Sequence, residues 1–235
     1  MSVMGLFFIL IASTALWWLA RQGVLQSPWL EEGEIADFPG AELLPRPPAA
    51  KVGLGVFLAV AGCLFSLLCA AFFMRMESPD WVSPPVPGIL WFNTAVLIAS
   101  SLALHLAQRA AGRRETDSLR SWLLVGGGCA VLFLLGQLWA WRELSAAGLY
   151  ASTNPANAFF YLLTGTHALH LIGGLAALAR TARKAWSGGN SAGLASSVEL
   201  CAIYWHFLLF VWLLLFAMLA GWADNFGVIC RRLLS

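Results

Sequence analysis

The stretch NAFFYLLTGTHALHLIGGLAAL, Asn157–Leu178, decides the fold class. It is long and apolar enough to cross a bilayer, because a spanning helix needs about 20 apolar residues. His167 and His170 lie near its middle and share a helical face with Gly174, since residues three and four apart lie on one side of a helix. Imidazoles at membrane depth are costly unless they meet a partner inside a helix bundle. The stretch therefore predicts a transmembrane helix whose polar face meets protein.

Small residues and a start signal refine this helix. Gly165, Gly173 and Gly174 are expected to let a neighbouring helix approach closely. Asn154 followed by Pro155 is typical of a helix start, because the asparagine side chain caps the first turn and proline suits its first position.

The composition describes an integral membrane protein. Of 235 residues, 60% are hydrophobic, 11% are charged and 12 are tryptophan. The net charge of +2 and basic residues scattered over short loops argue against a nucleic-acid partner.

Six segments reach the length of a spanning helix, so we predict an all-α membrane protein with one N-terminal helix and a five-helix bundle. These segments are Val3–Ala20, Val52–Met74, Ile89–Gln108, Trp122–Trp141, Ala156–Ala179 and Val198–Trp222.

The predicted organisation has four parts. Residues 1–20 form the N-terminal helix, which we expect to be retained, since no basic residue precedes its apolar run and no cleavage site follows it. Residues 21–51 form an acidic, proline-rich linker, because prolines deny this stretch a continuous helix. Residues 52–222 form the bundle, and residues 223–235 a C-terminal tail.

Orientation follows from the basic residues, which concentrate in cytoplasmic loops of membrane proteins. The three loops on one side carry Arg21, Arg46, Lys51, Arg109, Arg113, Arg114, Arg120, Arg180, Arg183 and Lys184. The other side carries Arg75, Arg142, Arg231 and Arg232. This asymmetry predicts that both termini face the periplasm.

Several polar side chains fall inside the predicted spans. Amides and hydroxyls there usually join helices, at roughly 0.6–2 kcal/mol per bond. Glu199 and His206 lie seven residues apart and so share a helical face. The others are Asn93, Ser100, Ser101, His105, Gln137 and Tyr204.

Redox chemistry in this chain would have to use four histidines, His105, His167, His170 and His206, and few acids inside the spans. A haem–copper centre or a di-iron site needs more ligands than these. A haem held by His206 with His167 or His170 remains an alternative by count alone. No nucleophile elbow, phosphate loop or carboxylate pair accompanies them, so no catalytic machinery is visible.

Two long runs and three shorter ones resemble subunit III of the haem–copper cytochrome c oxidases. The long runs are FFYLLTGTHALHLIGG, Phe159–Gly174, and VELCAIYWHFLLFVWLLLF, Val198–Phe216. The shorter ones are AAFFMR (Ala70–Arg75), LWFNTAVLIASS (Leu90–Ser101) and LLGQLWAW (Leu134–Trp141). The resemblance covers roughly Val52 to Trp222, in the order of that family.

The resemblance implies a non-catalytic subunit of a proton-translocating terminal oxidase in the bacterial inner membrane. Subunits I and II would be its partners and would hold the haems and copper, while this chain would bind phospholipid in a cleft between its N-terminal part and its bundle. We expect lipid-binding or interhelical polar contacts from Arg75, Asn93, Gln137, His167, His170, Glu199, Tyr204 and His206.

Three positions depart from the family pattern. A buried glutamate of the family aligns with Ala61, an aspartate aligns with Leu209, and a histidine before the last helix has no equivalent in Ser191–Ser197. The family's proton-supply role for that glutamate therefore does not transfer. An accessory subunit of a nitric oxide reductase is the alternative within the resemblance, and a di-histidine haem b protein is the alternative outside it.

Overall fold

The computed structural model describes residues 13, 49–187 and 191–221, and this part of the chain is helical with short connections. Its helices are α2 (Ala49–Met76), α3 (Ile89–Gly112), α4 (Thr116–Ala146), α5 (Pro155–Trp186) and α6 (Ser191–Leu219). All five are long and apolar enough to cross a membrane. The predicted all-α membrane class is thus confirmed over these residues. The sixth predicted span, Val3–Ala20, and nearly all of the linker and tail lie outside the described residues.

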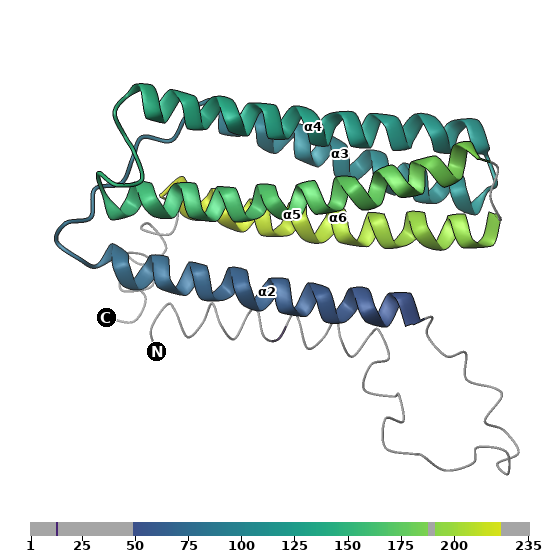
Figure 1. Cartoon of the computed structure of the whole chain (residues 1–235), viewed down its shortest axis with the longest axis horizontal. Helices are drawn as coiled ribbons and strands as arrows, with labels where there is room; N and C mark the ends of the chain where they lie inside the picture. The colour runs from purple at the N-terminus through teal and green to yellow at the C-terminus, as the bar shows by residue number, and fades with distance from the viewer. Residues whose placement is uncertain (1–12, 14–48, 188–190, 222–235) are drawn as a thin grey trace, which may run out of the picture. The chain divides into compact units, whose positions relative to one another are not determined.

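The chain divides into two compact units, residues 1–66 and 67–235. The described part of the first unit is Ser13 and residues 49–66 of α2. The second unit contains α3 to α6, which run along one another in Figure 1. Contacts join α3 to α4, α4 to α5, α5 to α6 and α6 back to α3, so these four helices close into a ring around a shared interior.

Aromatic side chains in the second unit tie the end of α2 to the loop that follows it and to α5. The Phe72 ring meets the Trp81 ring edge-to-face at 4.9 Å and the Phe159 ring at 5.8 Å. Such edge-to-face pairs contribute about 0.5–1.5 kcal/mol beyond the area they bury.

The helix start predicted at Asn154–Pro155 is confirmed. Asn154 is the N-cap of α5, and its side chain accepts a hydrogen bond from the Ala156 backbone at 3.0 Å, with Pro155 in the first helical position. This bond satisfies one of the backbone N–H groups that the first turn leaves without an intrahelical partner.

All five helices extend beyond their predicted bounds at one end or both, and α6 begins at Ser191 rather than at Val198. α4 runs from Thr116 to Ala146 rather than from Trp122 to Trp141, and α5 continues past Ala179 to Trp186. An apolar run detects only the part of a helix that fits the hydrocarbon, whereas backbone hydrogen bonding continues into the headgroup region. The loop placement was therefore wrong for six of the basic residues, which lie inside the ends of helices: Lys51, Arg109, Arg120, Arg180, Arg183 and Lys184. Arg109 lies in the last turn of α3, and Arg183 and Lys184 lie in the last turn of α5. Cations are favourable there, at the negative end of the helix dipole.

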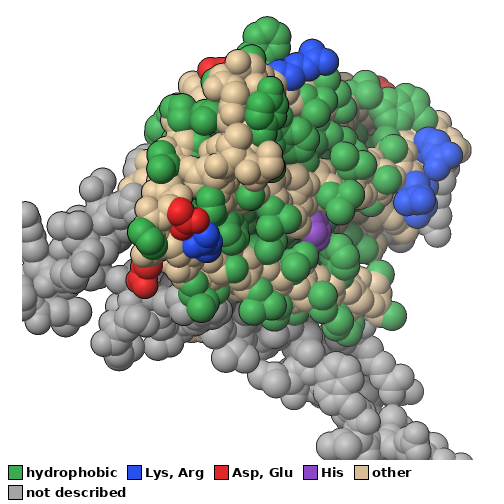
Figure 2. All heavy atoms as spheres, turned by 60° about the vertical axis from the view of Figure 1, so that its left-hand side comes forward, with side chains coloured by type: hydrophobic (Ala, Val, Ile, Leu, Met, Phe, Trp, Pro, Cys, Tyr) green, Lys and Arg blue, Asp and Glu red, His purple; other side chains and the backbone are tan. Residues whose placement is uncertain are grey.

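Figure 2 shows hydrophobic side chains spread over the described surface, where charged side chains are few. Large apolar side chains point outward from all five helices, among them Leu67, Leu102, Leu135, Leu169 and Phe210. Outward apolar side chains on every helix are expected of a bundle whose solvent is lipid.

Candidate functional site

Two neighbouring residues of α3 contact two neighbouring residues of α6 along one seam of the bundle. The Trp205 indole Nε1 donates to the Ser100 hydroxyl at 2.8 Å. One position along each helix, the Ser101 hydroxyl lies 2.6 Å from Nδ1 of His206. Ser100 and Trp205 are fully buried, whereas the His206 side chain is exposed. Successive residues of a helix point about 100° apart, so one pair faces the interior and the other the outer edge of the same seam.

Ser100 also joins a third helix to this seam. Its hydroxyl donates to the backbone carbonyl of Gly126 on α4 at 2.7 Å. α4 comes this close because Gly126 has no side chain: a Cβ there would lie 3.0 Å from the Leu104 side chain. One buried hydroxyl therefore accepts from α6 and donates to α4, and so links three helices.

Two more indoles bond to hydroxyls inside the ring. Trp212 Nε1 donates to Thr94 Oγ1 at 2.9 Å, and Trp141 Nε1 donates to Thr164 Oγ1 at 3.0 Å. Each threonine in turn donates to the carbonyl four residues earlier in its own helix, at 2.8 Å and 2.7 Å respectively. A buried indole N–H without a partner is costly, and these bonds remove that cost inside an interior that holds no bulk water.

His167 is the fully buried histidine of the predicted pair. Its Nε2 donates to the Leu208 carbonyl on α6 at 3.1 Å, which requires the proton on that nitrogen because a carbonyl only accepts. The ring lies between Phe133 and Trp212, with ring centroids at 5.6 Å and 5.2 Å. His167 thus links α5 to α6 within an aromatic cluster.

His170 lies at the edge of the buried face and is only partly buried. Its Nδ1 lies 2.8 Å from the Thr166 carbonyl of the same helix, while its own backbone carbonyl accepts from the Tyr204 hydroxyl at 2.8 Å. The predicted site therefore holds Tyr204 through the backbone of His170.

The three glycines of the opening stretch differ in what they contact. A Cβ on Gly174 would lie 2.6 Å from the Tyr204 ring and 2.9 Å from the Trp205 ring, so α6 packs directly on this position. Nothing lies within 4 Å of a Cβ on Gly173, and one on Gly165 would make ordinary contact with Trp141 at 3.9 Å. The expectation of close approach was thus right for Gly174. It was wrong for Gly173, which points away from α6, and for Gly165, where a side chain would have room.

Asn93 and Gln137 are both buried, with 0% and 1% exposure. No described residue hydrogen-bonds to either side-chain amide. Asn93 packs against Gly136, the residue before Gln137, and a Cβ on Gly136 would overlap the Asn93 amide. Sequence reasoning picked both amides but missed Gly136, whose only signal is a glycine inside an apolar run.

The other two predicted residues lie away from this centre. Arg75, at the end of α2, makes two bonds to Asp80, from Nη1 to Oδ1 at 2.9 Å and from Nη2 to Oδ2 at 2.6 Å. Both side chains are largely exposed, at 39% and 55%, so the pair contributes little stability. Glu199 is partly exposed in the early turns of α6.

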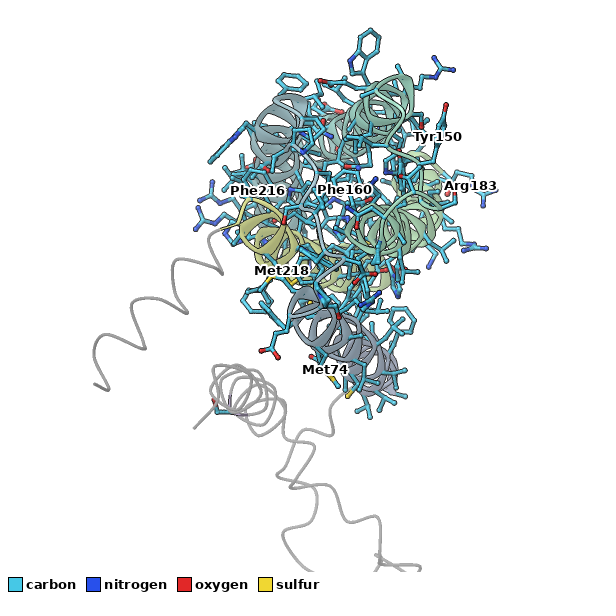
Figure 3. The ribbon with its side chains drawn as sticks, turned by 90° about the vertical axis from the view of Figure 1, so that its left-hand side faces the viewer. Met74, Tyr150, Phe160, Arg183, Phe216 and Met218 are labelled. Atoms are coloured by element: carbon cyan, nitrogen blue, oxygen red, sulfur yellow. The ribbon has the colours of Figure 1, made fainter. Side chains whose placement is uncertain are left out.

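A small cavity opens at the end of the bundle seen in Figure 3, where Phe160, Phe216 and Met218 are labelled. Its volume is about 170 Å³. The α2–α3 loop supplies Trp81 and Pro85, α5 supplies Phe160, and α6 supplies Met218 to its lining. The cavity is mainly apolar and lies apart from the hydrogen-bonded centre.

His167 and His206, one of the two histidine pairs that a bis-histidine haem could use, bond to different helices. A haem needs two imidazoles that approach one iron from opposite sides. His167 is enclosed by Phe133 and Trp212 and bonds to α6, whereas His206 bonds to Ser101 on α3 at the outer edge. Within residues 49–187 and 191–221, no three His, Cys, Asp or Glu side chains gather as a metal site requires.

Fold and site together define a multi-pass membrane protein whose interior polar groups join its helices to one another. A family profile described as "Cytochrome c oxidase subunit III" matches residues 48–224. The chain belongs to the cytochrome c oxidase subunit III family, which confirms the resemblance of its two long runs, and it is a subunit III of a haem–copper oxidase.

Individual relatives agree with this assignment. "Probable cytochrome c oxidase subunit 3" of Mycobacterium tuberculosis (strain ATCC 25618 / H37Rv) is 32% identical over 185 residues, covering 75% of this chain and 89% of the relative. "Cytochrome c oxidase subunit 3" of Thermostichus vulcanus is 32% identical over 184 residues, covering 74% and 88%. The protein of that name from Synechocystis sp. (strain ATCC 27184 / PCC 6803 / Kazusa) is 29% identical over 184 residues, covering 74% and 76%. These names favour the oxidase over a nitric oxide reductase or an independent haem protein.

Proposed function

We propose that this chain is a non-catalytic subunit of a proton-translocating terminal oxidase in a bacterial inner membrane. It binds the catalytic subunit I and subunit II, holds phospholipid, and stabilises the site at which oxygen is reduced. The haems and copper belong to the partner chains.

The observation that carries this proposal is how the interior polar groups are used. Ser100, Thr94 and Thr164 each receive an indole N–H, and His167 bonds to the Leu208 carbonyl. These bonds join helices rather than converge on a point where a substrate or an electron carrier could bind. A bundle built in this way acts as a rigid scaffold, and a scaffold that binds the folded catalytic subunit stabilises it by mass action.

This chain has only a small role in proton uptake by the oxidase. The family's buried glutamate aligns with Ala61, which is 3% exposed. A methyl group neither binds nor releases a proton. Proton delivery to the partner therefore depends on the partner's own groups.

We place a phospholipid contact at the end of α2. The cavity wall there includes Phe72, Met76 and Trp81, which suit a hydrocarbon chain. Arg75 precedes Met76, and its guanidinium now bonds to the exposed Asp80 carboxylate. A lipid phosphate would replace that carboxylate as the partner of the guanidinium.

We also propose an orientation in the membrane, with both termini in the periplasm. Arg120 donates from Nε and Nη2 to the Ala185 carbonyl at 3.1 Å and 3.0 Å, so the start of α4 lies beside the end of α5. At the opposite end of the bundle, Asn154 donates to the Val82 carbonyl. The α3–α4 and α5–α6 connections therefore share one end, which is rich in Arg and Lys, and we assign that end to the cytoplasm.

Cysteine accessibility tests the orientation. A cysteine at Arg113 should react with a membrane-impermeant maleimide only after the cells are opened, and one at Tyr150, in the connection at the other end, should react in intact cells. The reverse pattern would overturn the assignment.

Mass analysis of the intact complex tests the function. The affinity-tagged chain, extracted in a mild detergent, should carry a haem–copper catalytic subunit, subunit II and phospholipid at fixed stoichiometry. Recovery with a nitric oxide reductase, or recovery of the chain alone with haem bound, would contradict the proposal.

A further inference from the structure

The outer face shared by α3 and α6 carries ionisable side chains, and one of them, His206, lies at mid-membrane depth. It is defined by six residues, namely Leu102 and His105 on α3, and Glu199, His206, Phe210 and Leu213 on α6. The α6 members recur at helical spacing and so form one stripe. The centroids of the His105 and His206 rings lie 5.7 Å apart across the seam between the two helices. The α3 residues and the α6 stripe therefore lie on the same face.

His206 lies at the middle of the membrane span. It is the central residue of Gly193–Leu219, which is 27 residues long. At a rise of about 1.5 Å per residue it is roughly 20 Å from either end, too far for its ring to reach a headgroup. Its side chain is nevertheless exposed in the single chain.

The bond to Ser101 uses one edge of the His206 ring. Nδ1 lies 2.6 Å from the Ser101 hydroxyl, and Nε2 lies on the edge of the ring away from it. No described residue bonds to Nε2, although an imidazole can donate or accept there. Lipid chains offer no hydrogen bond, and ionisable residues within spans almost always face protein or a water-filled cavity.

The outer face of α4 provides a contrast within the same bundle. Its stripe Leu124, Val131, Leu135 and Leu138 is exposed by 63%, 46%, 57% and 50% and contains no polar side chain. Such a stripe is satisfied by lipid. The α3/α6 face is also exposed and apolar at Leu102 and Phe210, by 58% and 45%, but it adds the imidazoles of His105 and His206.

We infer that the α3/α6 face is the docking surface of this chain for the catalytic subunit. This inference rests on the proposed function. The occupant is a transmembrane helix of that subunit, with apolar side chains against Leu102 and Phe210 and a hydrogen-bonding group opposite Nε2 of His206. Pairing of this kind fixes the register of two membrane helices, as polar residues at helix interfaces do.

Photo-crosslinking in native membranes tests the surface. A benzophenone amino acid at Leu102 or at Phe210 should form an adduct with the catalytic subunit of the intact complex. The same group at Leu135 or Leu138, matched in exposure on α4, should form lipid adducts. Lipid adducts alone at Leu102 and Phe210, or adducts with a second copy of this chain, would overturn the docking surface while leaving the family and the proposed function intact. Adducts with a protein of another complex would overturn the proposed function as well.

A pair of His206 variants tests the polar contact. H206L should raise the fraction of catalytic subunit lost during detergent purification by about 2- to 10-fold, the range of one interfacial hydrogen bond. H206Q keeps a donor and an acceptor and should retain the catalytic subunit better than H206L. The amount of each variant in the membrane before extraction corrects for misfolding. Equal retention in both variants would contradict the role of His206, and the crosslinks, made with His206 intact, test the surface independently.

Discussion

Trp205 and Ser100 lie 105 residues apart in the chain and share a 2.8 Å hydrogen bond in the fully buried centre of the bundle. The same serine donates to Gly126 on the neighbouring helix. One hydroxyl on α3 thus forms hydrogen bonds to both α6 and α4.

We predict that Ser100→Ala lowers the free energy of unfolding by about 1–3 kcal/mol. The substitution leaves the Trp205 N–H buried without its partner, which costs more than the hydrogen bond alone, and it removes the link to α4, whose Gly126 carbonyl keeps its own intrahelical bond. For a chain of this size that corresponds to a fall in melting temperature of roughly 2–4 °C per kcal/mol, measured on the detergent-solubilised complex. Ser197→Ala, at an exposed hydroxyl outside the centre, is the control and should melt near the wild type. If the wild type, Ser100→Ala and Ser197→Ala melted at the same temperature, Ser100 would not stabilise the bundle as proposed.

The two adjacent glycines of α5 give a second prediction. Gly174→Ala should destabilise the bundle by about 1–3 kcal/mol, because its Cβ would overlap the Tyr204 and Trp205 rings and force α6 away. Gly173→Ala has open space and should be neutral or slightly stabilising, since alanine favours a helix over glycine. Thermal unfolding of both variants separates the two positions. A Gly174→Ala protein as stable as Gly173→Ala would show that α6 does not pack there.

The two turns that end α3 and α4 give a third prediction. Both use the same pattern of backbone bonds, with a left-handed residue just beyond the C-cap, which is Gly148 after α4 and Arg114 after α3. Because φ is +59° at Arg114, a side chain there is strained, and Arg114→Gly should keep or raise stability by up to about 1 kcal/mol. Gly148→Ala places a side chain at φ +77° and should lower stability by about 1 kcal/mol. Melting temperatures that move in the opposite directions would contradict this account of the turns.

The fourth prediction concerns haem. The isolated chain should show no Soret band, because His167 and His206 each bond to a different neighbouring helix and do not face one another. Absorbance spectra of the purified chain, with and without added haem, measure this. A band that disappears in His206→Ala would sink the prediction.

The sequence predicted the helices well where composition decides them. Apolar runs of spanning length marked α2 to α6, and Asn154–Pro155 marked the start of α5, because bilayer thickness and capping act locally. The same local reasoning missed the helical turns that extend beyond the hydrocarbon, for example at both ends of α4 and at the end of α5. These turns contain polar residues, so a search for apolar runs does not detect them.

The partners of the polar residues could not be predicted in the same way. His206 was expected to contact lipid or another helix, but nothing in the sequence named Ser101 of α3 as its partner. Arg75 bonds to Asp80, which sequence reasoning had not selected. Gly173 and Gly174 look alike in sequence, yet they point about 100° apart, and only Gly174 faces α6. Pairings of this kind depend on the rotation of each helix about its axis, which tertiary packing sets.

The most direct test of the central claim is the turnover of an oxidase from which this chain has been deleted. We expect the purified enzyme to begin near its normal rate, because the chain supplies scaffold and lipid contacts rather than reacting groups. It should then lose activity faster than the complete complex during catalysis or heating, since a stabilising partner has been removed. Initial turnover abolished in a complex that retains its haems and copper would contradict the non-catalytic role, and an unchanged rate together with an unchanged lifetime would place this chain in another complex.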